Sequence, residues 1–294
     1  MPDNATIAEV ESQPKTWQWA LSILPSLEGM PADGERVAVV GCGTSWFMAQ
    51  SYAALREARG QGETDAFTAS EFPAGRSYDR VVAISRSGTT TEIVQLLGAT
   101  ATPTVLLTAV GGSPAGAQAD HQVVLDRADE SSVVQTRFAT TALLVLRASL
   151  GEDVTHLVGQ AEAALRYEVD AAWTEADQLT FLGAGWTNGL AHEAALKFRE
   201  SSQSWTESYP AMEYRHGPIS IAQPGRIVWM FGEPPEGLAD EVTQTGATFR
   251  ASEHDPLVQL VLLHRVAVAR AAAKGLDPDT PRHLSRSVIL SAGE

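Results

Sequence analysis

A turn rich in hydroxyl groups is the first stretch of the sequence that could do chemistry. Residues 85–91 contain five serine or threonine side chains and Arg86. They follow the apolar run of residues 80–84, which is typical of a buried strand, and precede residues 92–97, which are typical of a helix. Backbone N–H groups at a helix N-terminus carry partial positive charge, so this turn can bind an anion of phosphate size. Serine and threonine also cap helices without binding any ligand, and the turn alone leaves both interpretations open.

A charged helix in the second half of the chain offers acid and base groups. Glu193, Lys197 and Glu200 are spaced by four and then three residues, so they project from one face of a predicted helix. If that face looks into a cleft, a carboxylate beside a cation can move a proton and stabilise the charge that develops. The alternative is a solvated face with an ordinary Glu–Lys pair.

His216 is a further candidate because it lies in a polar stretch, residues 207–218, that ends in Gly-Pro. A histidine in such a loop is unlike a core histidine, and histidine titrates near neutral pH. A catalytic role and an ordinary loop position both remain possible from these residues alone.

The elements that must position these groups alternate between strand and helix over the first 150 residues. Predicted strands cover residues 36–40, 80–84, 104–108 and 122–126. This alternation is typical of a parallel sheet covered on both faces, which binds ligands at the carboxyl ends of its strands. Polar turns follow three of these strands and contain Thr44 and Ser45, then Ser85, Ser87 and Thr90, then Gln135 within residues 131–137. Three polar turns at one sheet edge are more than capping requires, so they favour an anion site.

The second half of the chain repeats the first at an offset of 142 residues. Gly183 and Gly185 repeat Gly41 and Gly43 at this offset, which implies two similar α/β halves. The counterpart of the hydroxyl-rich turn, in residues 225–235, has lost every hydroxyl. We therefore expect the first half to hold the phosphate. The second half is also short between residues 233 and 256, so we expect it to lack one sheet element.

The remaining segments read as connections. Residues 3–34 predict two short helices broken near Pro14, because proline interrupts a helix interior. Residues 151–177 predict a linking helix, and residues 256–274 predict a helix that leads into a proline-containing strap.

Composition narrows the choice of partners and location. The chain has 294 residues and a formal charge of −15, which would repel nucleic acid and anionic membranes and favours a small, enclosed ligand. No apolar run approaches the length that spans a bilayer, and the first residues lack a secretory signal. A single cysteine, Cys42, excludes an internal disulfide framework, so we expect a cytoplasmic protein. Gly-x-Gly at residues 41–43 is weak evidence for a nucleotide cofactor, and no zinc spacing or Walker motif is present, so we expect neither cofactor nor metal.

Together these residues resemble the sugar isomerase (SIS) domain family. The matching landmarks are residues 41–45 (GCGTS), 85–90 (SRSGTT), 193–200, 207–218 (ESYPAMEYRHGP) and 279–284 (DTPRHL). The resemblance covers about residues 35–290. Over this range the chain is similar to the isomerase half of glucosamine-6-phosphate synthase and to aminosugar-phosphate deaminases and deglycases. It implies two tandem doubly wound, flavodoxin-like parallel-sheet SIS domains. The expected parts are a helical arm (1–34), a phosphosugar-binding SIS domain (35–150), the linking helix (151–177), a second SIS domain with the catalytic helix and histidine loop (178–276) and the strap (277–294).

The resemblance also implies residue roles and partners. The substrate-binding residues would be Thr44, Ser45, Ser85, Arg86, Ser87, Thr90, Gln135 and Arg286. Glu200 would move a proton between C1 and C2 of the sugar, Lys197 would be its cationic partner, and His216 would open the sugar ring. Glu193 would be a further catalytic residue of the same helix. The family implies a homodimer in which His216 serves the neighbouring chain's site.

The expected activity is that of a phosphosugar isomerase or an isomerising deaminase of a hexosamine 6-phosphate. The alternatives are a fructosamine-6-phosphate deglycase and a non-catalytic phosphosugar sensor. The sequence departs from the synthase in three respects: Arg86 replaces a glutamine, Arg286 replaces the lysine of the strap, and no glutaminase with an N-terminal nucleophilic cysteine precedes residue 35. We therefore expect no ammonia supply from glutamine by this chain.

Overall fold

The computed structural model describes residues 4–73 and 75–290. The first three residues of the predicted arm, residue 74 and the last four residues of the predicted strap lie outside the described residues.

The first sheet contains five parallel strands in the order β2-β1-β3-β4-β5. Their bounds are β1 (Val37–Gly41), β2 (Thr64–Thr68), β3 (Arg80–Ile84), β4 (Thr104–Thr108) and β5 (His121–Val124). The central strands are buried along almost their whole length, as expected for a parallel sheet with helices on both faces. Strand β2 lies at the edge and is only partly buried, and its mixed residues gave no strand signal in the sequence.

The second sheet repeats this arrangement with one strand fewer. It contains β6 (Gln178–Gly183), β7 (Thr206–Pro210), β8 (Arg226–Met230) and β9 (Thr248–Arg250), all parallel, in the order β7-β6-β8-β9. The described residues hold no counterpart of β5, as the short segment between residues 233 and 256 predicted. The predicted fold class, two tandem doubly wound parallel sheets, is confirmed.

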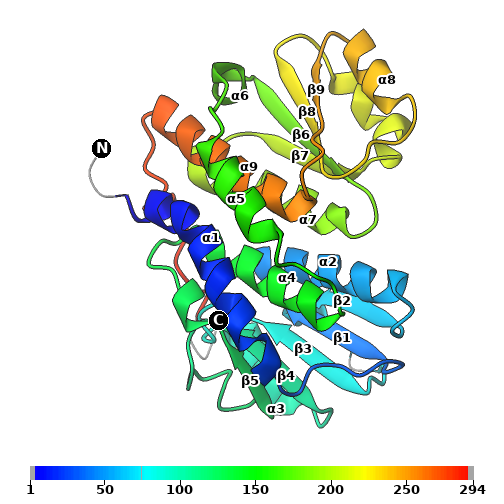
Figure 1. The fold of residues 1–294 in the computed structure, drawn as a ribbon, viewed down its shortest axis with the longest axis vertical. Coiled ribbons are helices and arrows are strands. Elements are labelled where there is room, and N and C mark those ends of the chain that lie inside the picture. The colour runs from blue at the N-terminus through cyan, green and yellow to red at the C-terminus, as the bar shows by residue number, and fades with distance from the viewer. Residues whose placement is uncertain (1–3, 74, 291–294) are drawn as a thin grey trace.

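The sheets lie at opposite ends of the molecule, with α2, α4, α7 and α9 between them (Figure 1). The helices are α1 (Ala5–Ile23), α2 (Thr44–Ala58), α3 (Thr91–Ala99), α4 (Arg137–Ser149), α5 (Leu157–Arg166), α6 (Ala171–Glu175), α7 (Thr187–Ser202), α8 (Leu238–Gln244) and α9 (Pro256–Ala273). Short 3₁₀ turns are η1 (Leu24–Ser26), η2 (Ala69–Glu71), η3 (Asp126–Ala128), η4 (Glu213–His216) and η5 (Pro218–Ile221). Helices α2 and α7 approach closely, because a Cβ added at Gly189 would meet the Phe47 carbonyl oxygen at 2.3 Å.

The internal repeat extends to backbone geometry. Gly43 and Gly185, which precede α2 and α7, have φ angles of 54° and 56°. A Cβ added at Gly41 would lie 2.5 Å from the backbone of Ser45, and one added at Gly183 would lie 2.4 Å from the backbone of Thr187, each in the first turn of the helix that follows. Glycine is required at these positions because each strand must turn directly into its helix.

The N-terminal segment differs from the prediction. Residues 5–23 form one helix, although Pro14 lies inside it. Proline removes the N–H that would bond the carbonyl of Val10, but the side-chain amide of Gln13 donates to that carbonyl at 3.1 Å. The neighbouring side chain therefore replaces the missing donor, and the helix continues. The predicted linking helix is likewise two helices, α5 and α6.

Helix α9 is long and apolar enough to cross a membrane by length and composition, with a mean hydropathy of 1.3. This corrects the expectation that no apolar run reaches that length. Within this fold, 67% of the helix window is buried, so α9 serves as a core helix between the sheets.

Candidate active site

Three charged residues on α7 form a linked group. The Lys197 Nζ atom lies 3.4 Å from Glu193 Oε1 and 2.5 Å from Glu200 Oε2. Glu193 and Lys197 are completely buried, whereas the Glu200 side chain keeps 18% exposure. The helix face predicted from the spacing of four and three residues therefore points into the protein and is not a solvated surface. Of its three charged side chains, Glu200 is the one that is partly exposed.

Burial shapes the protonation of this group. Burial raises the pKa of Glu193 to about 7, against the opposing effect of Lys197. Burial alone would lower the pKa of Lys197, but the charges of Glu193 and Glu200 outweigh it and raise that pKa. Lys197 therefore remains a cation and holds the more exposed carboxylate of Glu200 in place.

Thr44 connects this group to the first domain. Its hydroxyl, at the start of α2, donates to Glu193 Oε1 at 3.3 Å. The hydrogen bond crosses the contact between α2 and α7, which follow equivalent strands of the two sheets. The duplicated fold thus brings the glycine turn of one domain against the charged helix of the other.

A cavity of about 190 Å³ lies beside Glu200. It is lined by Cys42, Gly43, Thr44, Thr90, Glu92, Val133, Gln135, Glu200, Leu284, Ser285, Arg286, Ser287 and Val288. Thr44, Thr90, Gln135, Glu200 and Arg286 were all predicted site residues, and they come from five separate segments. The carboxyl edge of the first sheet, the charged helix and the strap therefore meet at one place.

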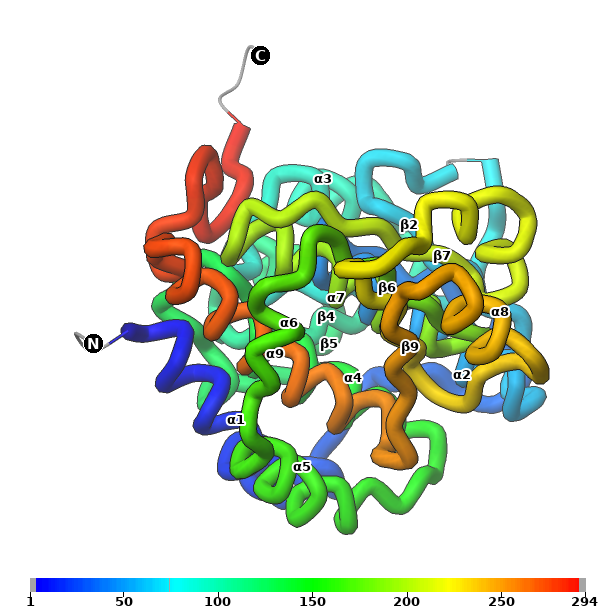
Figure 2. Tube along the Cα trace, turned by 90° about the horizontal axis from the view of Figure 1, so that it is seen from above, coloured from blue at the N-terminus to red at the C-terminus, as the bar shows by residue number. Residues whose placement is uncertain are grey.

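The strap fills the hydroxyl-rich turn. Ser287 Oγ lies 3.2 Å from Ser87 Oγ, 3.0 Å from Thr89 Oγ1 and 3.4 Å from Thr90 Oγ1. The backbone N–H of Thr91, in the first turn of α3, donates to the Val288 carbonyl at 3.2 Å. These are the groups that would bind an anion, so an anion that enters this turn has to displace Ser287 and Val288. In Figure 2 the strap is the red segment near α3.

Arg86 lies behind the cavity and not in its lining. Its guanidinium donates to the carbonyls of Ser132 and Arg286, both at 2.9 Å, and lies 3.5 Å from Glu130 Oε2. The side chain is almost fully buried. The structure thus gives Arg86 a different place from the substrate-binding one predicted: it joins the strap to the loop before α4.

Two buried carboxylates hold that loop, which carries Gln135. Glu130 accepts from the backbone N–H groups of Thr136 and Arg137 at 2.6 and 2.8 Å, and so caps α4. Glu9 of α1 accepts from the backbone N–H of Ser131 at 2.6 Å. The Gln135 Oε1 atom is buried without a hydrogen-bond partner in the described part of the chain. The N-terminal helix is therefore part of the support of the site.

Arg286 lines the cavity with its charge already engaged. Its Nε donates to the Glu130 carbonyl at 3.0 Å, and its guanidinium also pairs with Asp129. Arg286 is 39% exposed, so it remains accessible to a ligand from the solvent side.

Other predicted residues lie outside the cavity lining. Ser45 and Ser85 are buried beside it, and Ser87 belongs to the turn occupied by Ser287. Glu193 does not line the cavity; it pairs with Lys197, which in turn pairs with the lining residue Glu200. His216 is exposed on η4 of the second domain and does not line the cavity. Within one chain, the structure does not bring His216 to Glu200.

Ser287, Cys42 and Glu92 are among the eight lining residues that were not predicted as site residues from the sequence. Ser287 is adjacent to the predicted Arg286, but only the folded strap shows that its hydroxyl enters the turn. Burial raises the pKa of the Cys42 thiol, so this cysteine is not an activated nucleophile. Glu92 follows the hydroxyl turn directly and could have been found from that position.

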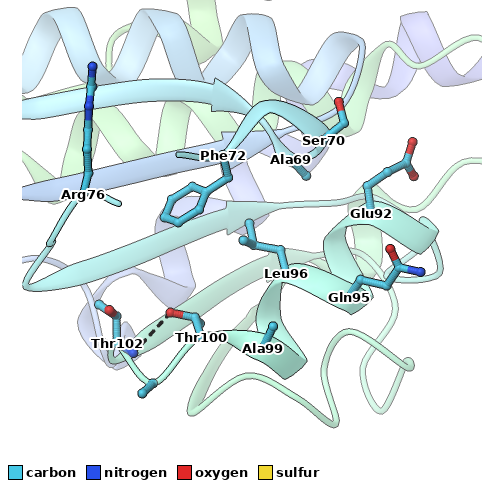
Figure 3. A pocket seen from close by; sticks show the side chains of 11 residues that line it. Ala69, Ser70, Phe72, Arg76, Glu92, Gln95, Leu96, Ala99, Thr100 and Thr102 are labelled. Carbon is cyan, nitrogen blue, oxygen red and sulfur yellow. Dashed lines mark hydrogen bonds between the residues drawn. The ribbon is translucent and has the colours of Figure 1, made fainter. Parts of the chain in front are cut away.

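A separate hollow, of about 670 Å³, lies between η2 and α3 and is also lined by Glu92 (Figure 3). Figure 3 shows Arg76 at one end and Glu92 with Gln95 at the other. Arg76 pairs with Asp65 at 3.3 Å, and its guanidinium lies over the ring of Phe67. Its charge is satisfied by neighbouring side chains, so we do not place the reaction here. Over residues 4–73 and 75–290, no group of three or more His, Cys, Asp or Glu is arranged to hold a metal ion.

Two doubly wound parallel sheets, with a polar turn and a charged helix at their junction, define the architecture of this chain, and sequence comparison identifies a family for part of it. Residues 32–150 match the model of the family described as the SIS domain, so this part of the chain is an SIS domain. The resemblance inferred from the motifs is confirmed for these residues, and the fold of the whole chain is shared with solved structures described below.

Particular relatives are enzymes of sugar phosphates by name. Glutamine–fructose-6-phosphate aminotransferase (isomerizing) of Sulfurisphaera tokodaii is 29% identical over 299 residues, covering 88% of this chain and 50% of the relative. The chain therefore spans about half the length of the curated relatives it matches. Glucosamine-6-phosphate deaminase from Thermotoga maritima has a TM-score of 0.83 at 24% identity, over 97% of this chain and 100% of that one. Tagatose-6-phosphate ketose/aldose isomerase from Escherichia coli has a TM-score of 0.78 at 16% identity, over 99% and 98% of the two chains.

Proposed function

We propose that the chain is a phosphosugar isomerase or an isomerising deaminase that acts on a hexose or hexosamine 6-phosphate. The observation that carries this proposal is the pair of Glu200 and buried Lys197, 2.5 Å apart, at the cavity that also contains Thr44, Thr90 and Gln135. An acid–base pair and a group of anion-binding donors on one cavity suit a substrate with a phosphate at one end and a reacting carbon at the other. The names of the relatives support the same class of substrate.

The reaction follows from these groups. The sugar phosphate enters the hydroxyl turn, where hydroxyl groups and the N-terminus of α3 hold it after the strap has moved. Glu200 removes a proton from C1 of the open-chain ketose and returns it to C2, while the proton of the C1 hydroxyl passes to the oxygen on C2, so that the aldose forms. Lys197 stays charged directly behind Glu200, and its electrostatic field favours the negative charge of the enediolate that forms between these steps. No step requires a metal or an organic cofactor.

His216 needs a second chain in this proposal. It is exposed on η4 and lies apart from Glu200 in its own chain. A homodimer that places His216 at the partner's cavity would supply the acid–base group for ring opening, because histidine titrates near neutral pH.

The proposal is tested by incubating the purified protein with fructose 6-phosphate, glucosamine 6-phosphate and fructosyl-amino-acid 6-phosphates. We expect conversion of at least one, with sugar products and ammonia or amine followed by NMR. Release of an amino acid would identify a deglycase. Binding of these compounds without conversion of any would contradict the enzymatic proposal and favour a phosphosugar sensor.

A further inference from the structure

A second cavity adjoins Glu200, and its lining contains no residue of the hydroxyl turn. It measures about 400 Å³, and its walls include Arg199, Ser204, Arg282 and His283. Glu200 and Leu284 line both this cavity and the smaller one beside the turn. The two spaces therefore meet at the residue proposed to move the proton.

Positive charge gathers around this second cavity. Arg199 and Arg282 line it directly. Behind its wall, Arg270 Nε and Lys274 Nζ both donate to Ser204 Oγ, at 2.7 and 2.9 Å. The chain as a whole carries a formal charge of −15, so four cations at one place oppose the overall composition.

These four cations have no carboxylate within 4.0 Å among the described residues. Glu200, the acidic residue of the lining, is already paired with Lys197. Burial and the neighbouring charge of Arg270 both lower the pKa of Lys274. By contrast, Arg76 in the hollow of Figure 3 has its own carboxylate partner.

Backbone strain marks the same wall. His283 has a φ of 64°, in the left-handed region that residues other than glycine seldom adopt. Strain of this kind concentrates at binding sites, where it costs about 1–3 kcal/mol and persists because the surroundings enforce it.

We propose that this cavity is a subsite for a second anionic group of the substrate, a carboxylate or a phosphate carried on the C1 side of the sugar phosphate. This inference rests on the proposed function, because it takes Glu200 as the group that acts at C1 and C2. With the C6 phosphate in the hydroxyl turn and Glu200 at the reacting carbons, a substituent on C1 extends into the cationic cavity. The substrate is then a sugar phosphate with two anionic ends.

Binding of matched ligand pairs tests the subsite. Isothermal titration calorimetry compares fructose 1,6-bisphosphate with fructose 6-phosphate, and fructosylglycine 6-phosphate with its uncharged glycinamide analogue. We expect the Kd of the more anionic member to be about tenfold lower in at least one pair, since charge-assisted hydrogen bonds are the stronger kind. The pair that shows the preference tells whether the group is a phosphate or a carboxylate. Raising the salt concentration should shrink the preference.

Variants locate the effect. The double variant Arg199→Gln/Arg282→Gln should reduce the ratio of the two Kd values to about one. Arg166→Gln removes one exposed charge at the end of α5, away from the cavity, and should keep the wild-type ratio. Ratios near one in both pairs for the wild type, or a preference that survives the double variant, would overturn the subsite. Failure of the wild type to bind fructose 6-phosphate and every other phosphosugar would instead overturn the proposed function.

Discussion

Glu193, Lys197 and Glu200 have different positions and therefore different tasks. Only Glu200 reaches the cavity, and the other two are completely buried. A buried carboxylate beneath a buried lysine costs desolvation energy unless it is paired, and here Thr44 and Lys197 supply the partners. We take Glu193 as a positioning residue that fixes Lys197, and Glu200 as the group that touches the substrate.

The burial of Glu193 predicts how stability depends on pH. Its pKa is raised from 4.5 to about 7 in the folded protein, so the folded state keeps this proton to a higher pH than the unfolded chain. Its contribution to stability is complete below about pH 4.5 and is lost as the pH rises through about 7. Glu193→Gln keeps the hydrogen-bond acceptor but cannot ionise. We expect urea unfolding to show a fall in stability from pH 5 to pH 8 that is smaller in this variant, by up to about 3 kcal/mol.

The control for this measurement is Glu162→Gln, at an exposed position of α5. It should leave the pH dependence of unfolding as in the wild type. An unchanged pH dependence in Glu193→Gln would show that Glu193 is ionised throughout this range.

For single residues, the sequence predicted contacts correctly where the side chains are neighbours on one helix. The spacing of Glu193, Lys197 and Glu200 fixes a common face, and the structure confirms that they contact one another. Arg86 shows the limit, because its partners are backbone carbonyls of residues 132 and 286, far away in the sequence. No local pattern could separate an arginine that binds phosphate from one that joins a loop to a strap.

The strap and the hydroxyl turn form the central contact between elements. The Ser287 hydroxyl is hydrogen-bonded to the hydroxyls of Ser87, Thr89 and Thr90, and the Val288 carbonyl accepts from the N–H of Thr91. A phosphate oxygen in this turn would take the position that Ser287 Oγ now has. Phosphate binding and release of the strap are therefore coupled.

This coupling predicts opposite effects of two substitutions at one position. Ser287→Ala removes the hydroxyl that competes with phosphate, so the Kd for inorganic phosphate should fall about three- to tenfold. Ser287→Glu places a carboxylate in the turn and should raise that Kd at least tenfold. Isothermal titration calorimetry measures both. A weaker affinity in Ser287→Ala would mean that the hydroxyl belongs to the phosphate site and does not block it.

The bounds of helices and strands were predicted correctly where an apolar run is followed directly by turn residues. Strands β3 and β4 lie at the predicted residues. In the described part of the chain the second sheet has four strands, as the short segment between residues 233 and 256 predicted. The predicted break at Pro14 was wrong, because the Gln13 amide supplies the hydrogen bond that the proline cannot. A general rule on proline cannot anticipate such a compensation by one side chain.

For the whole molecule, duplication explains why a site exists at the junction of two similar halves. Equivalent turns precede α2 and α7, and these helices pack together, so Thr44 of one half meets Glu193 of the other. The two halves then diverged, since only the first keeps the hydroxyl turn and only the second carries the charged helix. The histidine of the second half is still separate from the cavity of its own chain.

The proposed dimer predicts complementation between two inactive variants. Glu200→Gln and His216→Asn should each lose activity, but a refolded equimolar mixture should regain about a quarter of the wild-type rate. Half of the random dimers are mixed, and each has one site with Glu200 from one chain and His216 from the other. Sedimentation would confirm that the species are dimers. A mixture that stays inactive, although mixed dimers form, would exclude a shared site.

The central claim is that Glu200 moves a proton between C1 and C2 of a sugar phosphate. Its most direct measurement is exchange of the C1 proton in D₂O, followed by ¹H NMR on fructose 6-phosphate or whichever phosphosugar the wild type converts. We predict exchange with the wild type and a loss of at least about 100-fold in Glu200→Gln, with the phosphosugar Kd changed by less than about threefold. Exchange and conversion at the wild-type rate in Glu200→Gln would contradict the account.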